Sequence, residues 1–247
     1  MTTEVIAAAI AIALLASTCQ SLTGFGFAPV MTPLLAIAWG VKPAVATSMV
    51  LGTVNLLLLL REVRGSVSIP RVSWLLLGFA AGVPPGVFLL ERLDDDTLKA
   101  VVAATVIVAS LLLYVSPRLG GDRDTLAGRL FAGAVSGSIG SSTSLSAPPI
   151  VLYLMGRGLD VPSFRATTLV FFLPSNVLII LALALVGRIT GDVLLLSAAV
   201  LPSLGLGVVA GAWLRRRVRA ERFRAVVLAV LLATSVAVLA SALGDLT

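Results

Sequence analysis

The sequence contains no histidine and a single cysteine, Cys19, in 247 residues. Protein metal sites are built mainly from His, Cys, Asp and Glu side chains, and no group of these residues shows a metal-ligand spacing. Nucleophilic catalysis needs a Ser, Thr or Cys beside an activating base, and no Ser/His or Cys/His pair exists. One cysteine cannot form an internal disulfide. We therefore expect no enzyme, no catalytic residue, no metal and no cofactor.

Charged residues are scarce: they make up 12% of the chain, whereas 58% is hydrophobic and the mean hydropathy is +1.09. All twelve acidic residues lie at the ends of apolar segments or between them. Uncharged apolar runs span 43–60, 72–90, 100–117, 166–187, 193–214 and 225–244. Runs of roughly 18–22 residues match a hydrocarbon layer of about 30 Å. The sequence thus predicts an all-α, polytopic integral membrane protein.

The net charge of +6 and the pI near 10.7 do not indicate nucleic-acid binding. A nucleic-acid site would need a basic soluble face, and every segment between the apolar runs is short. Basic residues that flank apolar runs instead set the orientation of a membrane protein and contact anionic lipid. We expect the lipid bilayer, and no nucleic acid, as a partner.

Two loops of the chain resemble each other but carry opposite charge. Residues 86–99 align without gaps on 211–224, and both continue into Ala-Val-Val at 100–102 and 225–227. The first has Glu91, Asp94, Asp95 and Asp96 against Arg92 and Lys99, a net charge of −2, whereas the second has six arginines against Glu221, a net charge of +5. Because basic loops stay cytoplasmic, the two loops are expected on opposite sides of the membrane. This predicts two inverted repeats, an architecture of transporters.

The repeats are expected to be 1–118 and 119–247 within one transmembrane domain, 1–247. Each begins with a segment broken by glycine and small polar residues, 5–39 or 128–156. The flanking charges place both ends of the first segment outside and both ends of the second inside. Each broken segment is then a re-entrant-type helical hairpin, followed by about three transmembrane helices. The rival interpretation is eight spans in parallel repeats, which leaves the charge reversal unexplained.

The two hairpin tips are the candidate binding site. Gly, Ser and Thr disfavour a continuous helix, and irregular backbone at membrane depth is tolerated where it is buried in protein or lines a cavity. Each tip would present the N-terminus of a half-helix, which attracts anions. No acid lies deep in an apolar run, so a cationic substrate would find no counter-charge, and a small anion fits best. The predicted substrate-binding residues are Gln20, Thr23, Gly24, Phe25, Gly26, Phe27, Ser48, Asn55, Gly140, Ser141, Ser142, Thr143, Ser144, Thr168 and Asn176.

Several of these residues have a structural alternative. Asn55 and Asn176 are lone amides in apolar helices, and a hydrogen bond between helices accounts for either equally well. Three cations, Lys42, Arg61 and Arg165, lie near the tips and could attract anions, although snorkelling or setting the topology is the stronger interpretation. Gly82, Gly86, Gly205 and Gly207 are expected to allow close helix packing.

The chain resembles the TauE/SafE membrane permeases, also called the sulfite exporter or toluene-sulfonate uptake permease family. The resemblance rests on Gly24-Phe-Gly-Phe-Ala-Pro29 and Val41–Ser48, with related motifs at Ser141–Pro149 and Val161–Thr168. It implies a bacterial inner-membrane, multi-pass carrier of sulfite, thiosulfate, sulfonates, sulfoacetate or related anions. Many members have a richer glycine run where this chain has Phe25 and Phe27, and substrate and direction vary across the family.

We therefore expect a secondary transporter of a small sulfur-containing or carboxylated anion that works by alternating access. An anion channel and a non-transporting membrane subunit of a complex are the alternatives. The sequence leaves open the particular anion, import against export, the coupling ion and the oligomeric state, a homo-oligomer included.

Overall fold

The computed structural model describes residues 3–23, 26–60, 67–115, 124–215 and 217. This part of the chain consists of α-helices without strands. The helices are α1 (Thr3–Thr23), α2 (Phe27–Trp39), α3 (Val41–Leu60), α4 (Ile69–Arg92), α5 (Asp95–Val115), α6 (Leu126–Thr143), α7 (Ala147–Met155), α8 (Val161–Leu185) and α9 (Gly191–Arg215). Within the described ranges, α1, α3, α4, α8 and α9 are long and apolar enough to cross a membrane. The predicted all-α, polytopic architecture is confirmed.

The apolar runs 43–60, 72–90 and 193–214 lie inside α3, α4 and α9, and most of 100–117 and 166–187 lies inside α5 and α8. Proline is compatible with the first helical turn because its missing N–H has no partner there, and Pro70 and Pro162 lie in the first turns of α4 and α8. Pro174 and Pro202 lie inside α8 and α9 without ending them, as neighbouring helices permit in membrane proteins. The run predicted at 225–244 lies outside the described residues.

Both segments predicted to be broken are broken. α1 ends at Thr23, and α2 begins at Phe27 after Gly26, whose φ of 120° disfavours any residue with a side chain. α6 ends at Thr143, and its C-cap Ser144 adopts a left-handed conformation with φ 65° before α7 begins. Among the described residues, Ser144 alone has a positive φ without being glycine. Such strained residues cluster at functional sites.

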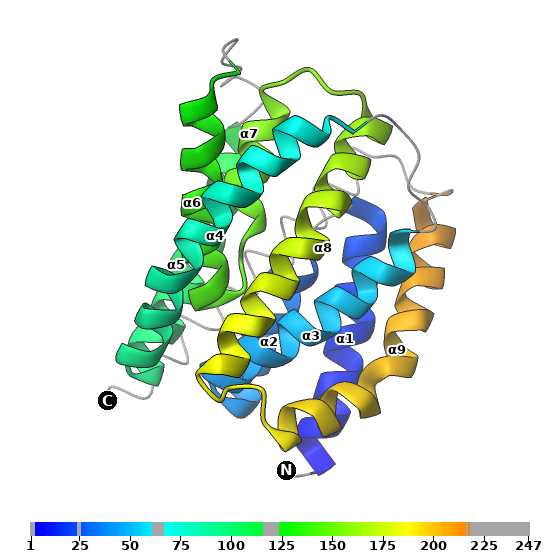
Figure 1. Cartoon of the computed structure of the whole chain (residues 1–247). Helices are drawn as coiled ribbons and strands as arrows, with labels where there is room; N and C mark the ends of the chain where they lie inside the picture. Colours follow the sequence, from blue (N-terminus) through cyan, green and yellow to red (C-terminus); the bar gives the residue numbers. More distant parts are fainter. Residues whose placement is uncertain (1–2, 24–25, 61–66, 116–123, 216, 218–247) are drawn as a thin grey trace.

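The two hairpins open towards opposite ends of the molecule. At one end, Lys42 Nζ donates to the carbonyl oxygen of Glu91 over 3.5 Å, which places the start of α3, next to the end of α2, beside the end of α4. At the other end, Arg71 of α4 pairs with Asp124, next to the start of α6, over 3.0 Å. α4 is about 36 Å long at 1.5 Å per residue, and it separates these contacts. Figure 1 shows α1 and α2 meeting the lower end, and α6 and α7 the upper end.

Each hairpin pairs with a helix from the other half of the chain: α6 packs along α4, and α1 packs along α9. An equivalent hydrogen bond from a serine to a backbone carbonyl occurs in each of the two pairs. Ser141 Oγ donates to the carbonyl oxygen of Val83 over 3.0 Å, and Ser21 Oγ donates to that of Val208 over 3.1 Å. Val83 precedes Gly86 by three residues, just as Val208 precedes Gly211, the residues from which the two matching loops start.

Glycines bring the paired helices into backbone contact. A Cβ atom on Gly82 would lie 2.1 Å from the carbonyl oxygen of Ala134, and one on Gly86 would lie 2.1 Å from that of Ser138. A Cβ on Gly207 would lie 2.8 Å from the carbonyl oxygen of Leu14. The predicted packing role is confirmed for these three glycines. It is wrong for Gly205, which has nothing within 4 Å of its Cβ position because it faces away from the other helices.

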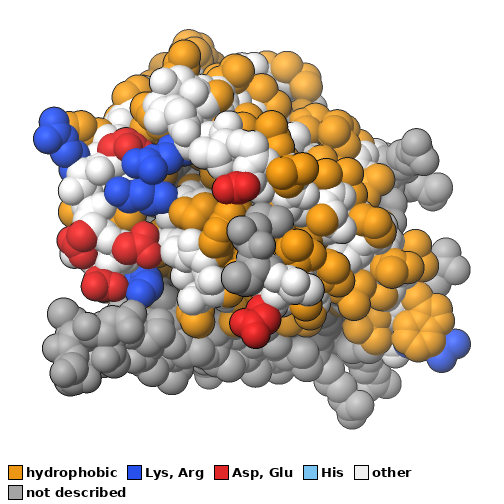
Figure 2. Space-filling view, turned by 90° about the horizontal axis from the view of Figure 1, so that it is seen from below, with side chains coloured by type: hydrophobic (Ala, Val, Ile, Leu, Met, Phe, Trp, Pro, Cys, Tyr) orange, Lys and Arg blue, Asp and Glu red, His pale blue; other side chains and the backbone are white. Residues whose placement is uncertain are grey.

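The helices form two bundles that exchange one member each. The first bundle holds α1, α2, α3 and α9, the second holds α4, α6, α7 and α8, and α5 contacts members of both. α3 and α8 cross at the centre and join the bundles (Figure 1). Large apolar side chains on the outer faces, including Leu77, Leu185 and Leu206, are exposed, as contact with lipid requires. Figure 2, which views the lower end, shows most of the charged side chains on its left and hydrophobic side chains dense at its top and right.

Candidate functional site

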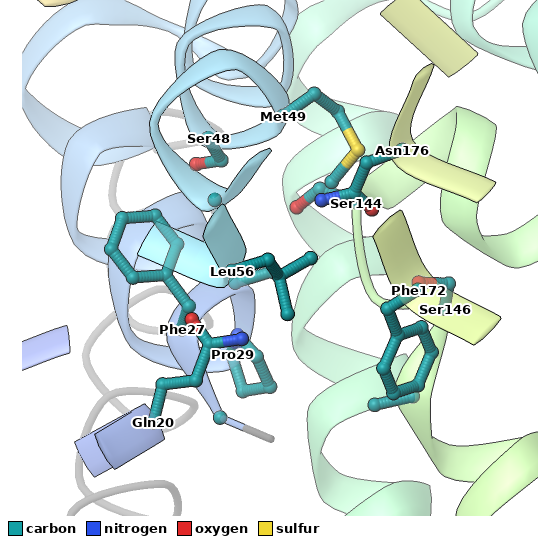
Figure 3. A pocket seen from close by; sticks show the side chains of 14 residues that line it. Gln20, Phe27, Pro29, Ser48, Met49, Leu56, Ser144, Ser146, Phe172 and Asn176 are labelled. Carbon is teal, nitrogen blue, oxygen red and sulfur yellow. The ribbon is translucent and has the colours of Figure 1, made fainter. Parts of the chain in front are cut away.

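A cavity of about 40 Å³ lies where the two hairpin tips meet α3 and α8. At about 10–15 Å³ for each enclosed water, it has room for roughly three waters or one small ion. Its lining residues come from five helices and both tips: Gln20, Gly26, Phe27, Ala28, Pro29, Ser48, Met49, Gly52, Leu56, Ser144, Ser146, Ala147, Phe172 and Asn176. Figure 3 shows the amide ends of Gln20 and Asn176 on either side of Leu56.

Both helix N-termini formed by the breaks face this cavity. The first turn of α2 contributes Phe27, Ala28 and Pro29, and α7 contributes Ala147. The first N–H groups of a helix have no partner inside it, and the helix dipole places partial positive charge there. Proline removes such a donor, so α7, with Pro148 and Pro149, presents fewer free N–H groups than α2. The backbone donors of the cavity therefore come mainly from the first tip.

Asn176 is the most available side-chain donor of the cavity. It extends from α8, is 6% exposed, and forms no hydrogen bond within the described part of the chain. Across the cavity lies Gly52 of α3, and a Cβ atom there would be 3.4 Å from Asn176 Nδ2. The Asn176 amide faces the cavity and stays available to a ligand that accepts a hydrogen bond.

Gln20 is the second amide of the cavity, and a buried network orients it. Ser17 Oγ lies 2.7 Å from Asn55 Oδ1 and 2.8 Å from the carbonyl oxygen of Leu204. Asn55 Nδ2 donates in turn to Gln20 Oε1 over 2.6 Å. Since its oxygen is occupied, Gln20 keeps its NH2 group for the cavity. The network also ties α1 to α3 and α9.

A row of hydroxyl groups links the second tip to α2 and α3. Thr32 Oγ1 donates to Ser48 Oγ over 2.8 Å and forms a short hydrogen bond with Ser144 Oγ. Ser144 and Ser48 line the cavity, whereas Thr32 lies behind them. This row crosses from the first bundle to the second. It holds the left-handed Ser144 in place.

Among the described residues that line the cavity, none is acidic or basic. The described residues also contain no group of His, Cys, Asp or Glu that could hold a metal ion. The site therefore offers amide, hydroxyl and backbone N–H donors together with apolar walls from Phe27, Met49, Leu56 and Phe172. Such a site can hold a small anion through hydrogen bonds and helix dipoles.

Six of the residues predicted from the sequence line the cavity: Gln20, Gly26, Phe27, Ser48, Ser144 and Asn176. Asn55 does not line the cavity, and its amide is not free for a ligand, because Ser17 bonds to its oxygen and its nitrogen donates to Gln20. Gly24, Phe25 and Arg61 lie outside the described residues, as does the side chain of Thr23. Binding of a substrate by the lining residues stays a prediction.

The remaining small residues of the second half do not reach the cavity. Gly140 packs against Ser146, where a Cβ atom would lie 2.6 Å from the Cβ of that serine. Hydroxyl groups in a helix commonly bond to a carbonyl one turn earlier, and four of the predicted residues do so. Ser141 donates to Gly137 as well as to Val83, Ser142 to Ser138, Thr143 to Ile139 and Thr168 to Arg165.

Of the three cations that the sequence places near the tips, the two that the structure describes, Lys42 and Arg165, have structural contacts. Lys42 reaches the carbonyl oxygen of Glu91, and Arg165 Nη2 donates to the carbonyl oxygen of Ser21 over 3.2 Å. A cation near the C-terminal end of a helix, here α1, interacts favourably with its dipole. Neither residue lines the cavity, so the geometry favours the structural interpretation of both.

Several lining residues were not predicted, among them Gly52, Leu56 and Phe172. Ser48, Gly52 and Leu56 follow one another at four-residue spacing, which places them on one face of α3. Phe172 precedes Asn176 by the same spacing on α8. Extending each predicted polar residue along its own helix face would have found all three.

The family comparison agrees with this architecture. The family model described as sulfite exporter TauE/SafE matches residues 9–238, nearly the whole chain. No curated protein and no solved structure matches the chain. The matched range includes both hairpins except the first turns of α1, the two central helices and every residue that lines the cavity. The chain therefore belongs to the sulfite exporter TauE/SafE family of membrane transporters.

Proposed function

We propose that this protein is a secondary transporter that carries a small sulfur-containing oxyanion, of the sulfite, thiosulfate, sulfonate or sulfoacetate class, across the bacterial inner membrane. The observation that carries the proposal is the meeting of two helix N-termini and a free amide, Asn176, in an uncharged cavity. Membership of the sulfite exporter family agrees with it.

The chemistry of the lining favours an anion over a cation or a neutral solute. A cation would need a carboxylate or a cluster of free carbonyl oxygens, and no acid lines the cavity. The Asn176 amide, the NH2 group of Gln20 and the start of α2 offer donors to an oxyanion. Charge-assisted hydrogen bonds of this kind are stronger than neutral ones.

The position of the cavity supports a carrier that works by alternating access. Its lining is divided between the two bundles: Ser48 and Gly52 belong to the first, and Ser144 and Asn176 to the second. The hairpins open towards opposite ends, and the two exchanged helix pairs use the same serine contact. These relations support two inverted repeats, 1–118 and 119–247, whose rocking would expose the cavity to each side in turn.

Purified protein in liposomes tests the proposal. Uptake of labelled sulfite that saturates with concentration and shows exchange across the membrane supports a carrier. Non-saturating flux with high conductance would indicate an anion channel, and the absence of flux without another protein would indicate a subunit of a complex. In the same assay Asn176→Ala should reduce uptake, because it removes a donor of the cavity. Ser142→Ala is the matched control, because the Ser142 hydroxyl bonds only within α6.

A further inference from the structure

Gly52 differs from the glycines that bring the paired helices into backbone contact. Alanine is more favourable than glycine in a helix, so an interior glycine calls for a reason. At Gly82 and Gly207 the reason is the neighbouring helix, whose backbone leaves no room for a Cβ atom. At Gly52 no backbone atom lies near the Cβ position. Close helix packing therefore does not account for this glycine.

The space beside Gly52 belongs to the cavity. A Cβ atom there would lie 3.4 Å from Asn176 Nδ2 and 3.4 Å from Phe27 Cδ1, which are ordinary contact distances. A methyl group would thus fit without moving its neighbours. It would, however, stand between the free amide and the aromatic ring, in space that the cavity now leaves open.

We propose that Gly52 is the specificity-determining residue of the cavity. Its missing side chain keeps open the space between the Asn176 amide and the Phe27 ring, and one oxygen atom of the anion binds in that space. This inference rests on the proposed function, since it assigns the position of the anion within the same cavity. It also accounts for a glycine in the central helix α3 at its contact with Asn176 of α8.

The test is Gly52→Ala with Gly205→Ala as the matched control. Both replace a glycine inside a long helix, but Gly205 has nothing within 4 Å of its Cβ position and lies away from the cavity. Thermal stability of the purified full-length chain is measured without ligand. Affinity for sulfite and for methanesulfonate is then measured by calorimetry on every variant.

We expect both variants to melt at or above the wild-type temperature without ligand. Gly52→Ala should lose at least about tenfold in affinity, as one added carbon in a filled pocket commonly does, whereas Gly205→Ala should bind like the wild type. Equal affinity of Gly52→Ala and the wild type would overturn the inference alone. A lower melting temperature of Gly52→Ala without ligand would also overturn it, because the position would then be packed. A wild-type chain that binds neither anion would overturn the proposed function as well.

A compensating change gives a second, independent test. Phe27→Leu removes the ring edge that the new methyl group would face. Combined with Gly52→Ala, it should restore at least about threefold of the lost affinity, since the two changes act on one space. If the double variant bound no better than Gly52→Ala alone, the two residues would not border the same ligand space, and the inference would be overturned.

Discussion

Asn55 donates its amide hydrogen to Gln20 over 2.6 Å, and this bond removes Asn55 from the cavity that Gln20 lines. Asn176, the other amide in a central helix, has no partner among the described residues and lies in the cavity. Two residues that look alike in the sequence therefore have different tasks.

Replacing the two asparagines should separate stability from binding. Asn55→Ala leaves the buried Gln20 oxygen without its donor, whereas Ser17 keeps the carbonyl oxygen of Leu204, so we expect the variant to lower the free energy of unfolding by about 2 kcal/mol. Asn176→Ala removes no intramolecular hydrogen bond and should reduce anion affinity about tenfold at nearly unchanged stability. Melting curves measure the stability of each variant, and the concentration dependence of sulfite uptake in liposomes measures its affinity for the anion. If Asn176→Ala lowers abundance as much as uptake, the residue is structural.

Gly82→Ala should break the contact between α4 and α6. Its Cβ atom would meet the carbonyl oxygen of Ala134 at 2.1 Å, and backbone cannot move aside as a side chain can. We expect a loss of about 3 kcal/mol or a failure to fold, read as the melting temperature and the yield of purified protein. Gly191→Ala, with open space at its Cβ position, is the control. Wild-type melting of Gly82→Ala would show that the two helices are not in backbone contact.

Stability should fall in acid through Asp124. The hydrogen bond from Arg129, with those from Tyr153 and Arg71, holds the pKa of Asp124 well below its usual 3.8. Because the pKa is lower in the folded state, the stabilisation is complete above the unfolded value and is lost as the pH falls through the folded value. Asp124→Asn should cost about 1 kcal/mol at neutral pH. The gap between the two melting curves should narrow below about pH 4; a gap that stays constant in acid would contradict this assignment.

Orientation can be read from single cysteines in a Cys19→Ala background. Asp94 and Asp160 are both exposed, the first between α4 and α5 and the second before α8. Asp94 follows the end of α4 that lies beside the first hairpin, whereas Asp160 follows the second hairpin, which opens at the other end of α4. We therefore expect Asp94→Cys and Asp160→Cys to react with an impermeant reagent from opposite sides of the membrane. Labelling of both from one side would remove the inverted arrangement.

The helices and both breaks could be predicted because hydrophobic length and helix-breaking composition are local properties. Thr23–Phe27 and Gly140–Ser144 predicted two breaks; in the structure α1 ends at Thr23 and α2 begins at Phe27, and α6 ends at Thr143 and α7 begins at Ala147. Charge in the loops predicted which helix ends lie on the same side of the membrane. The ion pairs of Arg71 with Asp124 and of Arg188 with Glu91 agree with that prediction.

The rotation of each helix could not be predicted in the same way. Asn55 lies 12 residues after Pro43, whereas Asn176 lies 14 residues after Pro162. Two residues turn an α-helix by about 200°, so the two amides do not occupy equivalent faces. Loop charge and hydropathy carry no information on this angle. Hydroxyl groups are equally ambiguous, because those of Ser142 and Thr143 bond to their own helix instead of the cavity.

The exchange of α4 and α9 between the bundles has a consequence for any severed form of the chain. A cut between α5 and α6 separates α1 from α9 and α6 from α4, so each fragment loses the surface on which its leading helix rests. Neither piece should fold unaided, yet co-expression of both should reconstitute the whole, since every broken contact runs from one piece to the other. The topology therefore predicts fragment complementation, which co-expression of the two pieces would test.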